Sequence, residues 1–168
     1  MPAERYTVRV SKDYLVFCAG HFITYDGDTC ERLHGHNYRT AVEVVGGLDA
    51  NHYLFDFIAL KRQVQKITDS LDHHMLLPTE SRFIRVEERG SNVQVRYQDR
   101  EWTFPREDCV LLPIANTTAE LLGRYIGQRL LDVLRREHGF EPEVLRVEVE
   151  ESFGQSATYE WTKASVEA

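Results

Sequence analysis

The sequence has few of the features that mark secreted or membrane-spanning proteins. Its only cysteines are Cys18, Cys30 and Cys109, widely spaced, and no charged start with a following apolar segment precedes them. Neither a disulfide framework nor secretion is therefore expected. No run of about 18 apolar residues is present to span a bilayer. We expect a cytoplasmic protein that does not enter the membrane.

Positive charge is also scarce. The chain has 168 residues with 20 basic and 27 acidic side chains, which gives a formal net charge of −7. This balance provides no general attraction to nucleic acid or to an anionic membrane, so we expect neither as a partner. Hydrophobic residues make up 42% and charged residues 28%, as in average soluble proteins. At this length we expect residues 1–168 to form a single domain around one core.

Extended segments are indicated near the start of the chain. Tyr6, Val8 and Val10 alternate with polar residues, which predicts a long strand over residues 6–21. A second extended run covers residues 38–45 and stops at two glycines. We expect these two strands to pair as a hairpin.

Two later segments have the spacing of amphipathic helices. The first follows Asp56, which is placed to cap it. Its apolar stripe consists of Phe57, Leu60, Val64, Ile67 and Leu71. The second helix follows Thr118 and stops at Gly139. Its apolar face consists of Leu122, Ile126, Leu130, Val133 and Leu134.

The chain between the helices, and the chain after them, is expected to be extended. Residues 79–113 read as a β-rich insertion. Its expected extended pieces are residues 83–86, 93–97, 102–104 and 110–112. Alternation of Leu145, Val147 and Val149 predicts a strand, and residues 157–161 follow as the last one. Two hairpins and two helices that cover one sheet face give an antiparallel α+β layer.

Segment 30–38 is the densest in chemically active side chains. In an extended strand, residues i and i+2 point to the same side, so His34 and His36 can offer two imidazoles to one metal ion, with Gly35 leaving space between them. Taken alone, such a pair is more often solvated. The hairpin would bring His21 beside them as a third ligand. Three neutral imidazoles leave a coordination position free, which is typical of catalytic zinc.

Cys30 precedes the first of these histidines by four residues and has several candidate roles. It could be a fourth zinc ligand, a buried spectator, or a nucleophile or base. Nearby imidazoles and a bound cation would lower the pKa of its thiol and favour the thiolate. Cys18 and Cys109 carry no signal beyond that of small apolar side chains.

Acidic side chains supply further candidates. Asp72 and His73 are expected at the end of the first helix, where a carboxylate beside an imidazole can orient it for proton transfer. A solvated helix end is the alternative. Glu151 is in phase with the apolar face of its strand, so we expect it to point inward and to suit a ligand with two parallel N–H donors. If the strand ends earlier, Glu151 is solvated.

Several separated motifs occur in order along the chain. They are Phe17-Cys18-Ala19-Gly20-His21-Phe22, the C-x-x-x-H-G-H segment from Cys30 to His36, Asp56-Phe57-x-x-Leu60-Lys61, Asp72-His73, Asn116-Thr117-Thr118-Ala119-Glu120 and Glu151-Ser152. Over almost its whole length the chain thereby resembles the family of 6-pyruvoyltetrahydropterin and 6-carboxytetrahydropterin synthases.

The resemblance implies the tunnelling fold, in which a four-stranded antiparallel sheet carries two helices on one face. Trimers close a barrel, and two trimers stack into a hexamer. It implies zinc on His21, His34 and His36. The catalytic residues that it implies are Cys30, Asp72 and His73. The pterin-binding residues that it implies are Glu151, Thr118 and Glu120, the last two from an adjacent subunit.

The implied substrate is 7,8-dihydroneopterin triphosphate. The three-residue gap between Cys30 and His34 resembles the queuosine-pathway branch, whose product is 6-carboxy-5,6,7,8-tetrahydropterin; the 6-pyruvoyl branch has a longer gap. A folate-bypass branch instead uses a glutamate, three residues before His-Gly-His, to release 6-hydroxymethyl-7,8-dihydropterin. This chain also has Glu31 at that position.

Cys30 and Glu31 would therefore compete as bases. A thiolate is more basic than a carboxylate by about four pKa units, so we expect mainly the 6-carboxy product, with the hydroxymethyl compound as a minor one. The alternatives are a solvated Glu31 without a role, or a zinc- and pterin-binding module without turnover.

Overall fold

The structure of the chain is a computed structural model that describes residues 4–163. The ends of the expected domain, residues 1–3 and 164–168, lie outside the described residues. The strands are β1 (Tyr6–His21), β2 (Thr24–Tyr25), β3 (Thr29–Cys30), β4 (His34–Gly46), β5 (His74–Pro78), β6 (Arg85–Arg89), β7 (Asn92–Tyr97), β8 (Arg100–Pro105), β9 (Cys109–Leu112), β10 (Val144–Ser152) and β11 (Gln155–Thr162). The helices are α1 (Phe57–Asp69), the short 3-10 helix η1 (Arg106–Asp108) and α2 (Ala119–His138).

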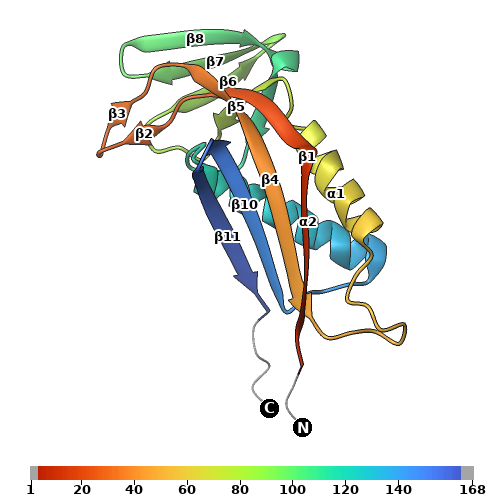
Figure 1. Ribbon diagram of the computed structural model, residues 1–168. Coiled ribbons are helices and arrows are strands. Elements are labelled where there is room, and N and C mark those ends of the chain that lie inside the picture. Colours follow the sequence, from red (N-terminus) through yellow and green to blue (C-terminus); the bar gives the residue numbers. More distant parts are fainter. Residues whose placement is uncertain (1–3, 164–168) are drawn as a thin grey trace.

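The main sheet has the strand order β11-β10-β4-β1-β5-β9. Strands β1, β4, β10 and β11 are those predicted from the sequence, and each pairs antiparallel with its neighbour among them. Helices α1 and α2 lie on the same face of this sheet (Figure 1). The predicted α+β layer is therefore confirmed for these elements.

The expectation of a four-stranded, purely antiparallel sheet is wrong, because two more strands join it. Strand β5 pairs in parallel with β1 at Ala19 and Gly20, and β9 pairs in parallel with β5. Residues 75–77 of β5 are buried. A strand buried on both faces shows no alternation, so its sequence gives little sign of a strand. The extended piece at 110–112, expected within the insertion, also belongs to the main sheet.

The β-rich insertion is confirmed and contains a sheet of its own. Strands β6, β7 and β8 pair antiparallel in that order. Figure 1 shows this sheet near β2 and β3, at the end of the molecule where β1 finishes. A separate apolar cluster lies beneath it, formed by Phe22, Met75, Leu77, Ile84, Val93, Val95, Tyr97 and Cys109. The insertion therefore packs beside the segment that carries His21.

The start of α1 is as predicted, and its end is earlier. Asp56 caps it, accepting hydrogen bonds from two backbone N–H groups at 2.5 and 3.1 Å. Phe57 does not belong to the buried stripe, since it is 55% exposed. The helix ends at Asp69, so Asp72 and His73 lie in the turn beyond it and do not close the helix.

Helix α2 has both of its predicted boundaries. Thr118 caps it, and Gly139 ends it in the left-handed conformation. The predicted face is buried at Leu122, Ile126, Leu130 and Leu134 and half-buried at Val133. In the described part of the chain, no helix has the length and apolar character needed to cross a membrane.

A register shift in the middle of β1 decides where its end points. Pairing with β4 shifts between Ser11 and Val16. Before the shift Val10 is buried, whereas after it odd-numbered residues such as Phe17 are buried. A bulge of this kind changes which alternate residues face the core. His21 is thereby directed to the helix-covered face.

Candidate metal centre and its surroundings

Three histidines meet where β1 ends and β4 begins. The register places His21 directly opposite His34, and His36 opposite Ala19. One ring nitrogen of each histidine lies within 4.8 Å of the other two. The structure therefore brings together the residues that the sequence analysis proposed as zinc ligands.

Backbone carbonyl groups fix the orientation of two of these rings. His21 Nδ1 lies 2.9 Å from the carbonyl oxygen of Thr117, and His34 Nδ1 lies 2.8 Å from that of Arg32. Because a carbonyl oxygen can only accept, each Nδ1 carries the proton and leaves the Nε2 lone pair free. Burial lowers the pKa of His21 below its ordinary value and so favours the neutral ring that a metal requires.

The third ring has a nitrogen in need of a partner. His36 Nε2 is buried and has no hydrogen-bond partner among the described residues. Such an atom costs free energy, which a metal ion placed between the rings would recover. Imidazole nitrogens are also among the ligands that zinc prefers. The residues present therefore fit a zinc ion.

Gly35 allows the two strands of the site to approach closely. It pairs with Gly20, and a Cβ atom on it would lie 2.9 Å from the carbonyl oxygen of Ala19. The sequence analysis attributed this glycine to the space between two imidazoles. The structure shows instead that the main chain of β1 excludes a side chain at this position.

Glu151 faces the same centre from β10. Its Oε1 lies 3.4 Å from His21 Nε2 and 3.5 Å from His36 Nε2. The Tyr38 hydroxyl donates to the same oxygen at 3.5 Å. Pairing of β10 with β11 shifts register at this residue. The inward direction predicted from alternation is confirmed, and the carboxylate is half-buried.

A groove of about 360 Å³ lies beside this carboxylate. Thr118 and Glu120, at the start of α2, line it together with Glu151. A single chain thus places all three pterin-binding candidates around one hollow. The contribution of an adjacent subunit stays a prediction.

Glu31 faces the histidines from the loop before β4. Its Oε2 lies 3.9 Å from His34 Nε2 and accepts a hydrogen bond from Ile23 N at 3.3 Å. Its own backbone N–H donates to the Ile23 carbonyl oxygen at 3.0 Å. Glu31 is therefore half-buried and held at the edge of the cluster.

Cys30 points in a different direction from its neighbour. Its side chain packs against the apolar cluster of the insertion, and its Sγ donates to the Glu31 carbonyl oxygen at 3.5 Å. Burial raises the pKa of the thiol, and the positive charge of Arg100 offsets this only in part. The direction is opposite to the one expected from neighbouring imidazoles. Cys30 also lies outside the cluster of converging ligand atoms.

Asp72 and His73 form a pair held on the backbone of Cys18. Asp72 Oδ2 lies 2.8 Å from His73 Nδ1, and its Oδ1 accepts from Cys18 N at 2.7 Å. Burial raises the pKa of Asp72, but the hydrogen bonds outweigh it and hold the pKa below its ordinary value. The His73 side chain is 82% exposed. Within the described residues, no hydrogen bond or ion pair joins this pair to the three histidines, Cys30 or Glu31.

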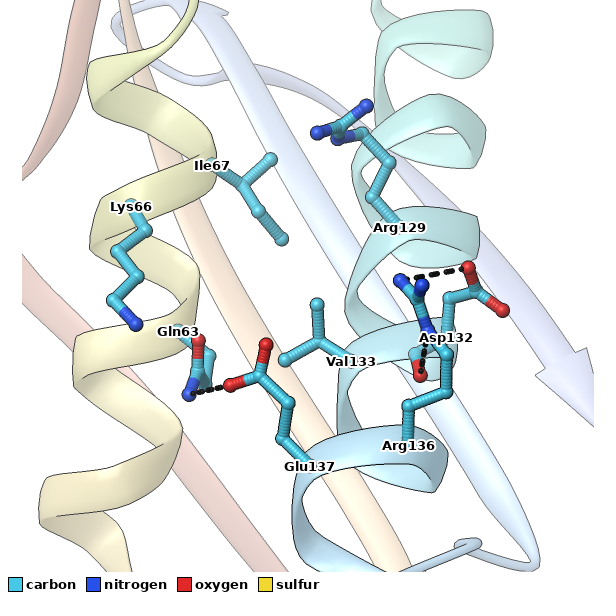
Figure 2. A pocket seen from close by; sticks show the side chains of 8 residues that line it. All are labelled: Gln63, Lys66, Ile67, Arg129, Asp132, Val133, Arg136 and Glu137. Atoms are coloured by element: carbon cyan, nitrogen blue, oxygen red, sulfur yellow. Dashed lines mark hydrogen bonds and ion pairs between the residues drawn. The ribbon is translucent and has the colours of Figure 1, made fainter.

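A second hollow, of about 260 Å³, lies between α1 and α2 (Figure 2). Gln63 Nε2 donates to a Glu137 carboxylate oxygen at 3.2 Å, and Arg136 pairs with Asp132 at 3.2 Å. None of the site residues predicted from the sequence lines it. The candidate chemistry is therefore confined to the other end of the sheet.

Sequence reasoning missed three residues of the site. The Tyr38 hydroxyl lies 3.1 Å from His21 Nε2, and burial raises its pKa, so it remains a protonated donor. Its phase on β4, which it shares with His34 and His36, could have revealed it. Thr117 and Arg100 act on or through backbone carbonyl groups, for which a sequence has no signal.

The sequence profile of the 6-pyruvoyl tetrahydropterin synthase family matches residues 9–162 of this chain. Among sequence relatives, a Methanocaldococcus jannaschii protein provisionally named 6-carboxy-5,6,7,8-tetrahydropterin synthase is 33% identical over 86% of this chain and 89% of its own. The Haemophilus influenzae 6-carboxy-5,6,7,8-tetrahydropterin synthase is 30% identical over 73% of this chain and 81% of its own.

Solved structures agree with these relatives. The Plasmodium vivax 6-pyruvoyltetrahydropterin synthase has a TM-score of 0.87 at 32% identity, covering 96% of this chain and 100% of that chain. A variant of the same protein, with a catalytic glutamate replaced by alanine, has a TM-score of 0.87 at 31% identity over the same shares. The chain belongs to the 6-pyruvoyl tetrahydropterin synthase family and is an enzyme of the tetrahydropterin synthase type.

Proposed function

We propose that this protein is a zinc-dependent lyase that cleaves the side chain of 7,8-dihydroneopterin triphosphate. The observation that carries the proposal is the convergence of three imidazoles with the carboxylates of Glu31 and Glu151. Three neutral histidines leave coordination positions for substrate oxygens, as in catalytic zinc sites. When bound, zinc supplies a Lewis acid that polarises the hydroxyl groups of the substrate side chain.

Glu151 is proposed to hold the pterin ring. A carboxylate accepts two parallel N–H donors, which the exocyclic amine and the adjacent ring N–H of a pterin present. The groove that Glu151 shares with Thr118 and Glu120 offers space for the ring next to the histidines. The trihydroxypropyl side chain would then extend toward the three imidazoles.

Glu31 is the better placed of the two candidate bases. Its carboxylate lies beside His34, whereas Cys30 faces the insertion and its pKa is raised by burial. Geometry takes precedence over basicity for a general base, since a group that does not reach the proton cannot remove it. The catalytic glutamate of the P. vivax relative supports a carboxylate in this role.

The product that follows from a Glu31 base is 6-hydroxymethyl-7,8-dihydropterin. Glu31 would take the proton of a side-chain hydroxyl while the neighbouring carbon–carbon bond breaks, and the ring-side carbon would then accept a proton. This order of products is the reverse of the one expected from basicity alone.

The 6-carboxy product, or the related 6-pyruvoyl product, is the second candidate. The names of the M. jannaschii and H. influenzae relatives favour it, and Cys30 is present as a free thiol. For this chemistry Cys30 would turn from the insertion toward the substrate. The Asp72–His73 pair would come from a neighbouring copy of the chain.

A hexamer of two trimers is proposed as the assembly. Strand β11 is an edge of the main sheet, and β1 pairs with β5 at Ala19 and Gly20 only, which leaves its first half as a second edge. Exposed strand edges favour pairing with other chains. The three free thiols also fit a reducing cytoplasm.

The test is incubation of the zinc-loaded protein with 7,8-dihydroneopterin triphosphate, with the products identified by mass spectrometry. Release of 6-hydroxymethyl-7,8-dihydropterin as the main product supports the proposal. A main 6-carboxy or 6-pyruvoyl product would establish the second candidate. Zinc and pterin binding without either product would leave the chain a binding module.

A further inference from the structure

We propose that Arg100 of the insertion is a positioning residue, which holds the Cys30–Glu31 backbone so that Glu31 faces the three histidines. The inference rests on the proposed function and gives the segment 79–113 a role in it. Arg100 is the first residue of β8 and is half-buried.

The guanidinium of Arg100 binds two consecutive carbonyl groups of the catalytic loop. Its Nη1 donates to the Cys30 oxygen and its Nη2 to the Glu31 oxygen, each at 3.1 Å. A planar fork that binds two neighbouring carbonyl groups fixes the peptide between them. In extended backbone, consecutive side chains point to opposite sides. Fixing this peptide therefore decides which side chain faces the histidines and which faces the insertion.

Arg100 is itself held by an aromatic stack. Its Cζ lies 4.7 Å from the centre of the Trp102 ring, a cation–π contact. The Trp102 ring stacks on Phe22, with centroids 4.6 Å apart. Phe22 is 1% exposed and follows His21 directly. The stack thereby connects the insertion to the strand end that carries His21.

The loop is held from a second side by Ile23. Glu31 N donates to the Ile23 carbonyl oxygen at 3.0 Å, and Ile23 N donates to the Glu31 carboxylate at 3.3 Å. These contacts orient Glu31, but they leave both carbonyl groups that Arg100 binds without this partner. Removing Arg100 would thus free one side of the loop while the histidines keep their own carbonyl contacts.

The test compares Arg100→Ala and Arg100→Lys with the wild-type, zinc-loaded protein. Arg96→Ala is the matched control, because Arg96 lies in the same small sheet and pairs only with Glu101 across it, at 2.9 Å. Amide hydrogen exchange is measured by mass spectrometry on peptides covering residues 24–33 and, as a reference, 144–152. In Arg100→Ala we expect exchange in 24–33 to rise by about tenfold or more, with no change in 144–152. Lys keeps the charge but not the fork, so we expect an intermediate rise.

Turnover provides the second measurement. We expect kcat of Arg100→Ala for 7,8-dihydroneopterin triphosphate to fall at least about tenfold, with KM changed less than about threefold, because the pterin groove is intact. Zinc content and Arg96→Ala should match the wild type. Unchanged exchange in 24–33 would overturn the proposal, as would faster local exchange with unchanged kcat. If the wild type does not turn over this substrate, the proposed function fails, and the exchange measurement alone decides whether Arg100 holds the loop.

Discussion

The Nδ1 atom of His21 lies 2.9 Å from the carbonyl oxygen of Thr117, 96 residues further along the chain. Thr117 also donates through its hydroxyl to the Phe22 carbonyl oxygen at 3.2 Å. The next residue, Thr118, begins α2 and lines the groove beside Glu151. One short segment therefore orients a candidate metal ligand and places one wall of the candidate pterin groove.

Replacing a candidate ligand should remove the metal. We expect about one zinc ion per chain in the wild type and a loss of most of it in His34→Ala and in His36→Ala, because two imidazoles bind zinc weakly. His52→Ala is the control, since His52 is exposed and lies outside the cluster. Elemental analysis after dialysis measures the metal. Full zinc in both ligand variants would contradict the assignment.

Replacing each candidate base should separate the two products. Glu31→Gln keeps the size of the side chain but removes the base, so the hydroxymethyl product should fall by about two orders of magnitude or more. Cys30→Ala should leave that product within a few-fold and abolish any 6-carboxy product. Both variants should retain zinc. A Glu31→Gln enzyme with unchanged products would make Glu31 a loop residue without a catalytic role.

The same experiment gains from a pH series. Burial raises the pKa of Cys30, so its thiolate is scarce at neutral pH and increases as pH rises toward that pKa. Any product that depends on Cys30 should therefore increase relative to the hydroxymethyl compound as pH rises. A ratio that falls with rising pH would contradict a thiolate base.

Glu151→Gln should weaken pterin binding. The amide replaces one acceptor oxygen by a donor that faces the donors of the ring, which costs about 1–3 kcal/mol of binding free energy. Glu150→Gln is the matched control, because the neighbouring carboxylate accepts from Gly154 N at 3.0 Å instead of facing the histidines. Calorimetry with a pterin ligand measures both. Equal affinities in the two variants would place Glu151 outside the binding site.

Gly35→Ala should damage the fold and the metal site together. Its Cβ would lie 2.9 Å from the Ala19 carbonyl oxygen, so β4 must move away from β1. We expect the free energy of unfolding to fall by about 1–3 kcal/mol and zinc affinity to fall with it. Gly47→Ala is the control, since nothing lies within 4 Å of a Cβ there. Urea unfolding of both variants measures the difference, and equal midpoints would refute the close approach.

The wild-type protein should sediment as a hexamer. The edges at β11 and at the first half of β1 would be left without partners in a monomer. Sedimentation equilibrium over a range of concentrations measures the mass. A stable monomer with full activity would contradict both the hexamer and a contribution of Asp72–His73 from a neighbouring copy.

Local patterns in the sequence determined much of the scaffold. The caps at Asp56 and Thr118 and the limits of β1 depend on residues close in the chain, so alternation, helical spacing and capping preferences reveal them. The shared phase of His34 and His36, and the inward phase of Glu151, follow from the same alternation.

Only the tertiary structure decided the features that depend on distant contacts. The register shift in β1 turns His21 to the helix-covered face, although the alternation before the shift does not extend to it. Strand β5 joins the sheet because its buried residues find partners on both faces, which no local period records. Cys30 and Glu31 are adjacent, and the hydrogen bonds to their backbone from Arg100 and Ile23 determine which of them faces the histidines. Such contacts join segments far apart in the chain, so the order of residues alone contains no sign of them.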